Sequence, residues 1–92
     1  MYLSVGNRDI VRKSDIVGIF DLDNTTVSKR TRVLLAKMQK EGRVRDASDG
    51  DLPKSMILCE HGGESVLWLS QYAPKTLWKR WTGRAEEDRP VL

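Results

Sequence analysis

The chain has 92 residues, of which 39% are hydrophobic and 32% charged, with a formal net charge of +3 and a single cysteine, Cys59. This length predicts one small domain with a modest core, and one cysteine excludes an internal disulfide and a cysteine zinc site. No apolar run reaches the roughly 18 residues of a membrane span, and the first residues lack the pattern of a signal peptide. The composition therefore predicts a cytoplasmic protein without a membrane partner.

Three short strands are predicted before residue 22. Tyr2–Val5 and Ile10–Arg12 flank Gly6-Asn7, a turn dipeptide in which both residues tolerate positive φ, so the pattern predicts a hairpin. Lys13–Asp15 predicts a second turn, and Ile16–Asp21 predicts a third strand. Because that strand is apolar on both faces, we expect it to be central and covered on both sides, within an N-terminal three-stranded antiparallel unit.

A long helix is predicted to follow. Asp23 to Thr26 offer several capping side chains in a row, and the helix is expected to run from Val27 to Glu41 with Gly42 as its C-cap. One apolar stripe at helical spacing predicts the buried face. Its members are Val27, Thr31, Leu34, Leu35 and Met38.

The second half of the chain predicts another hairpin. Val44 begins a short strand, and residues 46–53 form a loop by composition. Ser55–Glu60 and Ser65–Ser70 are apolar runs joined by His61-Gly62-Gly63-Glu64, which is a hairpin signal. We expect Cys59, within the first run, to be a small buried hydrophobe.

A short helix is predicted over Ala73–Trp81, with Pro74 in its first turn. Residues 1–81 are thus predicted to form a single α+β domain, and the charged residues 82–92 a loose tail. One long helix does not easily cover both faces of so many strands, so part of the apolar surface is expected to meet another subunit. The residues expected at this oligomer interface are Trp68, Trp78 and Trp81.

The segment Ile16–Thr26, IVGIFDLDNTT, permits two interpretations. An apolar strand followed by Asp-x-Asp-x-Thr is similar to the nucleophile motif of haloacid-dehalogenase-type phosphatases, with Asp21 as nucleophile, Asp23 as general acid and both near a magnesium ion. That chemistry also needs strand–helix–strand repeats, whereas a hairpin follows here. A strand exit and helix cap explains the same residues. We therefore expect no enzyme, metal or cofactor, and we expect the lone His61 to be a surface residue.

Positive charge is concentrated between residues 29 and 45, where seven Lys and Arg side chains accompany one acid, Glu41. Such a block is typical of a polyanion-binding surface, and equally of a solvated helix face. Cations near loops and strand ends would contact phosphates and gain strength from repetition in a homo-oligomer. The candidate nucleic-acid-binding residues are Arg8, Arg12, Lys13, Arg43, Arg45 and Lys54.

Residues 2–81 resemble the bacterial extracellular matrix regulatory proteins of the RemA/RemB family. The blocks that carry the resemblance occur in the same order along nearly the whole chain. They are MYLSVGN, KSDIVGIFDLDNTTVSK, DLPKSMIL, and VLWLS followed by APKTLWKR. The DLDNTT and DLPKS pieces are similar to the RemB-type branch.

The resemblance implies a non-enzymatic, cytoplasmic regulator of biofilm matrix genes that forms a ring-like homo-oligomer and binds double-stranded DNA, with no small-molecule substrate. It also implies a DNA contact through an Arg pair in the loop before the second hairpin, which is Ser48–Ser55 here. Asp51 and Leu52 stand at about the place of that pair, and Lys54 is the only basic residue in the loop. The alternative is an oligomeric scaffold or protein-interaction module without DNA binding.

Overall fold

The computed structural model describes residues 1–22 and 29–83. Within them, six strands form two sheets that are accompanied by two helices and one 3-10 turn, which gives an α+β fold as predicted. The elements in chain order are β1 (Tyr2–Ser4), β2 (Ile10–Arg12), η1 (Lys13–Asp15), β3 (Ile16–Asp21), α1 (Lys29–Lys40), β4 (Val44–Asp46), β5 (Ser55–His61), β6 (Glu64–Ser70) and α2 (Pro74–Thr82).

The larger sheet has four strands in the order β3-β5-β6-β4. Strand β5 pairs antiparallel with both β3 and β6, and the β5–β6 hairpin turns at Gly62-Gly63, where both residues have positive φ. Strand β4 instead runs parallel to β6, with Val44 opposite Leu67 and Asp46 opposite Leu69. The expected second hairpin is confirmed, and the predicted short strand at Val44 becomes the parallel edge of its sheet.

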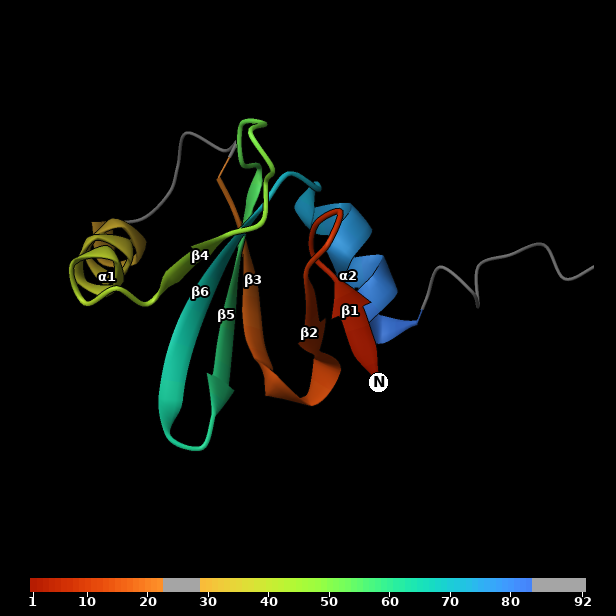
Figure 1. Cartoon of the computed structure of the whole chain (residues 1–92), viewed down its shortest axis with the longest axis horizontal. Coiled ribbons are helices and arrows are strands. Elements are labelled where there is room, and N and C mark those ends of the chain that lie inside the picture. The colour runs from red at the N-terminus through yellow and green to blue at the C-terminus, as the bar shows by residue number, and fades with distance from the viewer. Residues whose placement is uncertain (23–28, 84–92) are drawn as a thin grey trace, which may run out of the picture.

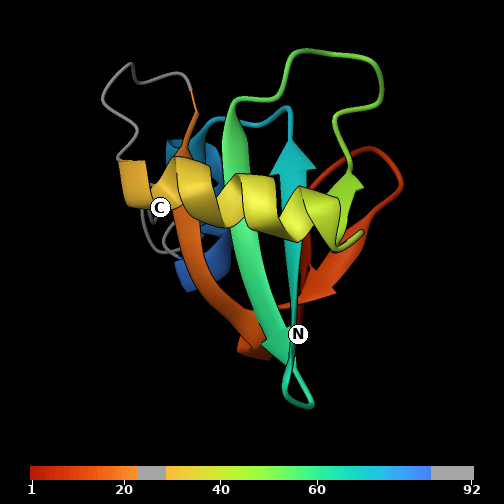
Figure 2. The same cartoon turned by 90° about the vertical axis from the view of Figure 1, so that its left-hand side faces the viewer.

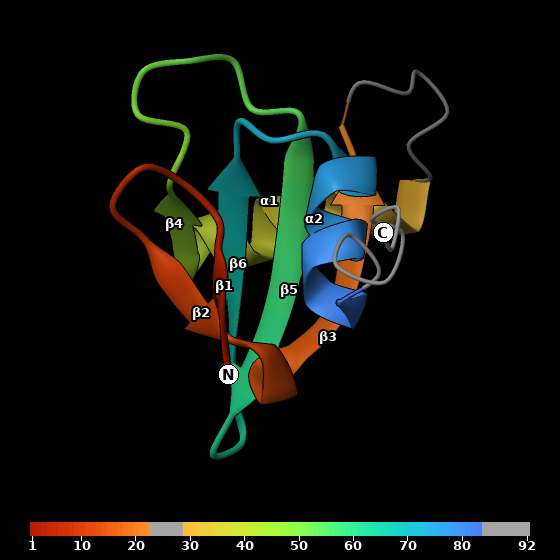
Figure 3. The ribbon, with the colours of Figure 1, turned by 90° about the vertical axis from the view of Figure 1, so that its right-hand side faces the viewer.

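This sheet is the middle of three layers (Figure 1). Helix α1 crosses one face of the sheet from the β3 side to the β4 side (Figure 2). The β1–β2 hairpin and α2 lie together on the opposite face (Figure 3). Both faces of a small sheet are therefore covered by elements of the same chain.

Two hydrophobic clusters fill the spaces between the layers. Met38, Met56 and Leu67 form the buried centre beneath α1, with Leu34, Leu35 and Phe20 packed around them. The second cluster joins the sheet to the hairpin and α2, and its buried members are Leu3, Val5, Val11, Ile16, Ala47, Ile57, Cys59 and Leu77. Alternate residues of β5 thus enter different clusters, which explains its continuous apolar run.

The prediction that Ile16–Asp21 is a central strand is wrong. Strand β3 pairs with β5 on one side only and forms an edge of the sheet, and it makes no ladder with β1 or β2 in the described residues. Its two-sided apolar pattern has a simple cause, because Ile16 and Ile19 contact one cluster and Phe20 the other. Burial on both faces is a property of the layers and does not require a strand on both sides.

The end of α1 follows the sequence closely. The backbone N–H of Gly42 donates to the carbonyl of Gln39, and that of Arg43 donates to the carbonyl of Met38. With φ at 73° for Gly42, this is a Schellman motif, and the predicted glycine C-cap is confirmed. The predicted start of α1 and the capping segment Asp23–Thr26 lie outside the described residues.

Gly6 lies where the β1–β2 loop approaches the backbone of Ala47 closely. A Cβ atom at this position would lie 2.2 Å from the carbonyl oxygen of Ala47, although Gly6 is not among the residues with positive φ. The β1–β2 loop is held against the larger sheet at this point, because the Ser70 hydroxyl donates to the carbonyl of Val5 at 2.7 Å. Close approach of two backbones, rather than left-handed geometry, therefore selects glycine here.

We expect Gly6→Ala to lower the free energy of unfolding by about 1–3 kcal/mol, because the added methyl group would push the hairpin loop away from Ala47. Urea unfolding followed by circular dichroism measures the change. Ala36→Ser, an exposed substitution on α1, is the control and should change stability by less than about 0.5 kcal/mol. Equal stability of Gly6→Ala and the parent would contradict the close approach.

Candidate nucleic-acid interface

The outer side of α1 is the most basic surface in the described part of the chain. The helix carries five exposed cations and no acidic residue over its whole length. They are Lys29, Arg30, Arg32, Lys37 and Lys40. A narrow apolar strip separates some of them, since Lys29, Arg30 and Lys37 surround Val33, which is 60% exposed.

Two further arginines, Arg43 and Arg45, follow the end of α1. Arg43 lies 3.8 Å from the carboxylate of Glu41, measured from its Nε, and both side chains are exposed. The Nη1 of Arg45 donates to the carbonyl of Gly42 at 2.9 Å, which directs this side chain along the sheet edge toward the C-terminus of α1. Guanidinium groups retain further donors after one such bond, so both arginines remain able to contact phosphate.

The loop at the place of the family's Arg pair is acidic at its tip. Ser48 to Asp51 form a tight turn in which the N–H of Asp51 donates to the carbonyl of Ser48, and Asp49 and Gly50 have φ values of 55° and 87°. Leu52, the next residue, is 81% exposed. A turn that presents two carboxylates disfavours phosphate at its tip.

Asp46 holds the base of this loop. Its Oδ1 accepts hydrogen bonds from both the backbone N–H and the hydroxyl of Ser48. These two donors lower the pKa of the Asp46 carboxyl below its usual value, because they favour the charged form. The carboxylate is therefore a structural acceptor that keeps its negative charge at neutral pH.

The other predicted cations are spread over the molecule. Arg8 lies in the β1–β2 loop, beside Asn7, whose side-chain amide donates to Asp49 at 3.1 Å. Lys54 lines a shallow depression with Asp51 and Tyr72, next to the loop just described. Lys54 thus has an acidic neighbour, and Arg8 is followed in the chain by Asp9.

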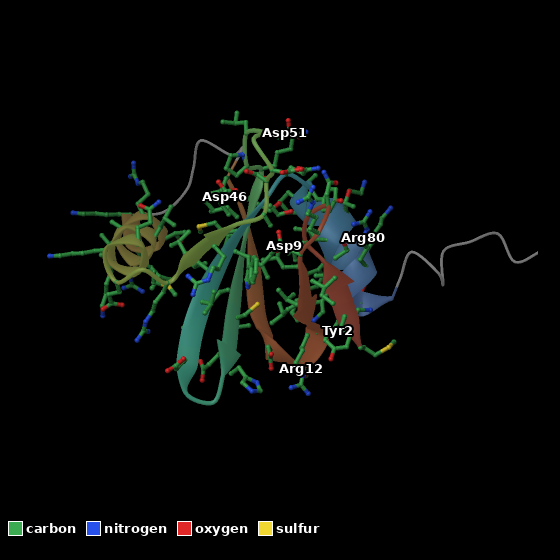
Figure 4. The ribbon with its side chains drawn as sticks, viewed as in Figure 1. Tyr2, Asp9, Arg12, Asp46, Asp51 and Arg80 are labelled. Atoms are coloured by element: carbon green, nitrogen blue, oxygen red, sulfur yellow. The ribbon has the colours of Figure 1, made fainter. Side chains whose placement is uncertain are left out.

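Arg12 and Lys13 lie at the opposite end of the hairpin, near η1. Figure 4 shows Arg12 at one end of the molecule and Asp51 at the other. Arg12 shares a hollow of about 350 Å³ with Arg45, between β2 and the sheet, and Asp15 and Glu64 also line it. Asp15 is itself paired with His61 at 3.2 Å.

The structure therefore brings the six predicted cations together only in part. Arg43 and Arg45 follow the C-terminus of α1, but Arg45 also shares the hollow on the hairpin side of the sheet with Arg12. Lys54 lies beside Asp51, Arg8 lies in the β1–β2 loop, and Lys13 begins η1. The cations of α1 belong to the basic block at residues 29–45, but they are not among the six candidate residues predicted from the sequence. The sequence signal for these residues is a predicted helix with five cations and no acid, whose outer face is therefore uniformly positive.

The three tryptophans expected at an interface have different environments. Trp68 is half-buried and packs against the cluster beneath the hairpin. Trp81 is also half-buried, and its Nε1 donates to the carbonyl of Lys13 at 3.2 Å, which ties α2 to η1. Trp78 is 50% exposed and meets Trp81 edge-to-face. Two of the three thus already contribute to packing within the protomer, and Trp78 presents the larger free surface.

Neither Asp21 nor Cys59 lies in an arrangement typical of a catalytic site. Asp21 ends β3 and is exposed, whereas Asp23 lies outside the described residues, so the phosphatase-like pair is not described together. Cys59 is buried in β5, as predicted; burial first, and then the nearby charge of Asp15, raise the pKa of its thiol to about 11. Within residues 1–22 and 29–83, no group of three His, Cys, Asp or Glu side chains could hold a metal ion.

Comparison with known protein families gives a match along most of the chain. Residues 2–81 match the RemA-like family, described as extracellular matrix regulatory protein A-like. The chain belongs to this family. A search among curated proteins finds no match. The RemA-like match covers every described strand and most of α2, so the acidic turn at Asp49–Asp51 stands within the family's own region. Neither described helix is long and apolar enough to cross a membrane.

The pKa shift of Asp46 predicts a pH-dependent contribution to stability. A carboxyl whose folded-state pKa lies below its unfolded value stabilises the fold above that unfolded value, near 3.8, and loses this effect as the pH falls through the folded-state pKa. We expect Asp46→Asn to lower the urea midpoint at pH 7, and the difference from the parent to shrink below about pH 4. The exposed Asp51→Asn is the control. A difference independent of pH would contradict the role of the Asp46 charge.

The environment of Cys59 predicts an unreactive thiol. With a pKa of about 11 instead of the ordinary 9.0, the thiolate fraction at pH 8 falls about 100-fold. We expect iodoacetamide to modify the folded protein at least about 100-fold more slowly than the urea-unfolded protein, as measured by intact mass. Similar rates in both states would show that β5 is not protected as described.

Proposed function

We propose that this RemA-like protein is a non-enzymatic, DNA-associated regulator of extracellular matrix genes, and that it acts as a ring-like homo-oligomer in the bacterial cytoplasm. In this proposal residues 1–81 form a single domain of the RemB-type branch, to which the DLDNTT and DLPKS segments are similar. Membership of the RemA-like family supports the regulatory role. The basic surface of α1 supports the DNA contact.

The observation behind the DNA contact is the concentration of positive charge on α1. The helix carries five exposed cations, Arg43 and Arg45 follow its C-terminus, and Glu41 is the single acid between residues 29 and 45. Contacts of this kind bind the phosphate backbone and carry little sequence information. A homo-oligomer repeats the surface at regular intervals, so weak contacts of single copies add together.

The position of the contact then differs from that implied by the family resemblance. Because Asp49 and Asp51 occupy the tip of the loop, phosphate is more favourably placed at α1 and β4 than at this loop. Arg8, Arg12, Lys13 and Lys54 would contribute where the assembled oligomer brings them beside α1 of a neighbouring copy. The alternative function, an oligomeric scaffold without DNA, is favoured by the same acidic loop.

Replacing two cations on α1 tests the proposal. We expect Arg30→Ala combined with Lys37→Ala to weaken binding to a duplex of random sequence and to reduce the slope of log K against log salt by about 0.9 for each lost phosphate contact. The two residues are seven apart and flank the same exposed strip. Fluorescence anisotropy between 50 and 200 mM NaCl measures both quantities.

A matched control exists on the other helix. Lys75→Ala combined with Lys79→Ala removes the same charge from exposed positions of α2, which lies on the opposite face of the sheet. This variant should bind DNA nearly as the parent does. Equal losses for both pairs would show that only net charge matters, and no binding by the parent at 50 mM NaCl would favour the scaffold.

A further inference from the structure

Four exposed residues form one row along the outer side of α1. They are Lys29, Val33, Ala36 and Lys40. Because neighbours in this row are three or four residues apart, their side chains lie one above another on the helix surface. The row lies on the side of the helix away from Met38, the buried residue of α1. It therefore has a cation at each end and small apolar side chains at its centre.

The other cations of the helix flank this row. Arg30 and Lys37 line a shallow apolar groove together with Val33, and Arg32 lies on the other side of the row. The helix itself has no acidic residue, and Glu41, which follows it, is already in an ion pair. Charge complementarity thus selects an anionic occupant for this surface, and the centre of the row offers that occupant an apolar contact.

The shape and place of α1 suit the major groove of DNA. Figure 1 shows α1 as the outermost described element on its side of the sheet, and in Figure 2 no other described element lies over its outer side. An α-helix with its side chains is about 10–12 Å across, and the major groove is about 12 Å wide. The outer row can therefore reach the base edges while the sheet stays outside the groove.

Resting on the DNA contact proposed above, we propose that α1 lies in the major groove and that Val33 contacts the C5-methyl group of thymine. This methyl is the apolar group by which thymine differs from the other bases in that groove. Lys29 and Lys40, at the two ends of the row, contact phosphates and hold the helix in position. The small side chain of Ala36 lets the helix approach the bases closely. Val33 thus reads the sequence, and the cations supply most of the affinity.

The apolar content of the outer row also favours DNA over an anionic membrane surface. A helix that binds lipid buries large apolar side chains in the interface between headgroups and acyl chains. The outer row of α1 has only Val33 and Ala36 for this purpose, because Leu34 and Leu35 pack against the cluster beneath the helix. Such a row matches a single methyl group better than a lipid layer.

Replacing thymine by uracil tests the contact, because it removes the methyl group and keeps every hydrogen-bonding group of the base. We expect the parent to bind a duplex of alternating A and T more tightly than the same duplex with uracil, by about fourfold for each methyl group that Val33 buries. Val33→Ala keeps the charge of the helix and should bind the two duplexes equally. Fluorescence anisotropy at 50 mM NaCl measures both ratios, and circular dichroism verifies that each variant is folded.

Two further variants separate sequence reading from charge. Val17→Ala makes the same substitution at another exposed valine, on β3, and should keep the parent's preference for thymine. Lys40→Ala should weaken binding to both duplexes alike, because a phosphate contact does not distinguish the bases. The ratio of the two affinities therefore responds to Val33 alone.

The outcomes distinguish this contact from the proposed function. If the parent binds both duplexes equally, or if Val33→Ala keeps the preference for thymine, the contact of Val33 with the methyl group is overturned while DNA association stands. If the parent binds neither duplex, the proposed function itself is overturned. Binding to vesicles of phosphatidylserine and phosphatidylcholine that Val33→Ala abolishes, without a preference for thymine, would assign the outer row to a membrane instead.

Discussion

The need to bury both faces of β5 organises this small domain. Met56 and Leu58 enter the cluster beneath α1, whereas Ile57 and Cys59 enter the cluster beneath the hairpin and α2. A sheet with two apolar faces needs two covering layers, and a chain of 92 residues has few segments to supply them. The β1–β2 hairpin and α2 share one face, and α1 alone covers the other. Loss of either layer would expose one half of the same strand.

Local patterns in the sequence predicted most elements, because caps, turns and apolar spacing act over a few residues. Gly42 ended α1 as expected, and Pro74 began α2. The pairing partners of each strand were harder to predict. A strand that is apolar on both faces, such as Ile16–Asp21, has the same sequence pattern at the centre of a sheet and at an edge whose two faces are covered. The expectation that part of the apolar surface meets another subunit stays a prediction, although the hairpin and α2 already cover one face of the sheet.

The candidate site shows the same division between local and long-range information. The sequence of residues 29–40 predicts the uniform charge of α1, because the cations of an amphipathic helix lie outside its apolar stripe. The sequence did not predict the separation of Arg12 from Lys54, since that separation depends on how the hairpin packs on the sheet. The loop was predictable in part. The sequence shows the acidic residues Asp49 and Asp51, but it does not show that Asp49 and Gly50 adopt positive φ values in a tight turn.

The crossover from β3 through α1 to β4 connects these features. It begins on one edge of the sheet and ends on the other, so a single segment of chain joins the two edges and carries the cationic helix between them. Because β3 and β4 run in the same direction, the crossover gives the sheet a polarity that an antiparallel pair of edges would lack. The strand Ile16–Asp21, whose DLD sequence first resembled a nucleophile motif, then has a structural explanation. Its apolar residues contact two clusters on opposite faces of the sheet, and Asp21 stands where the strand ends.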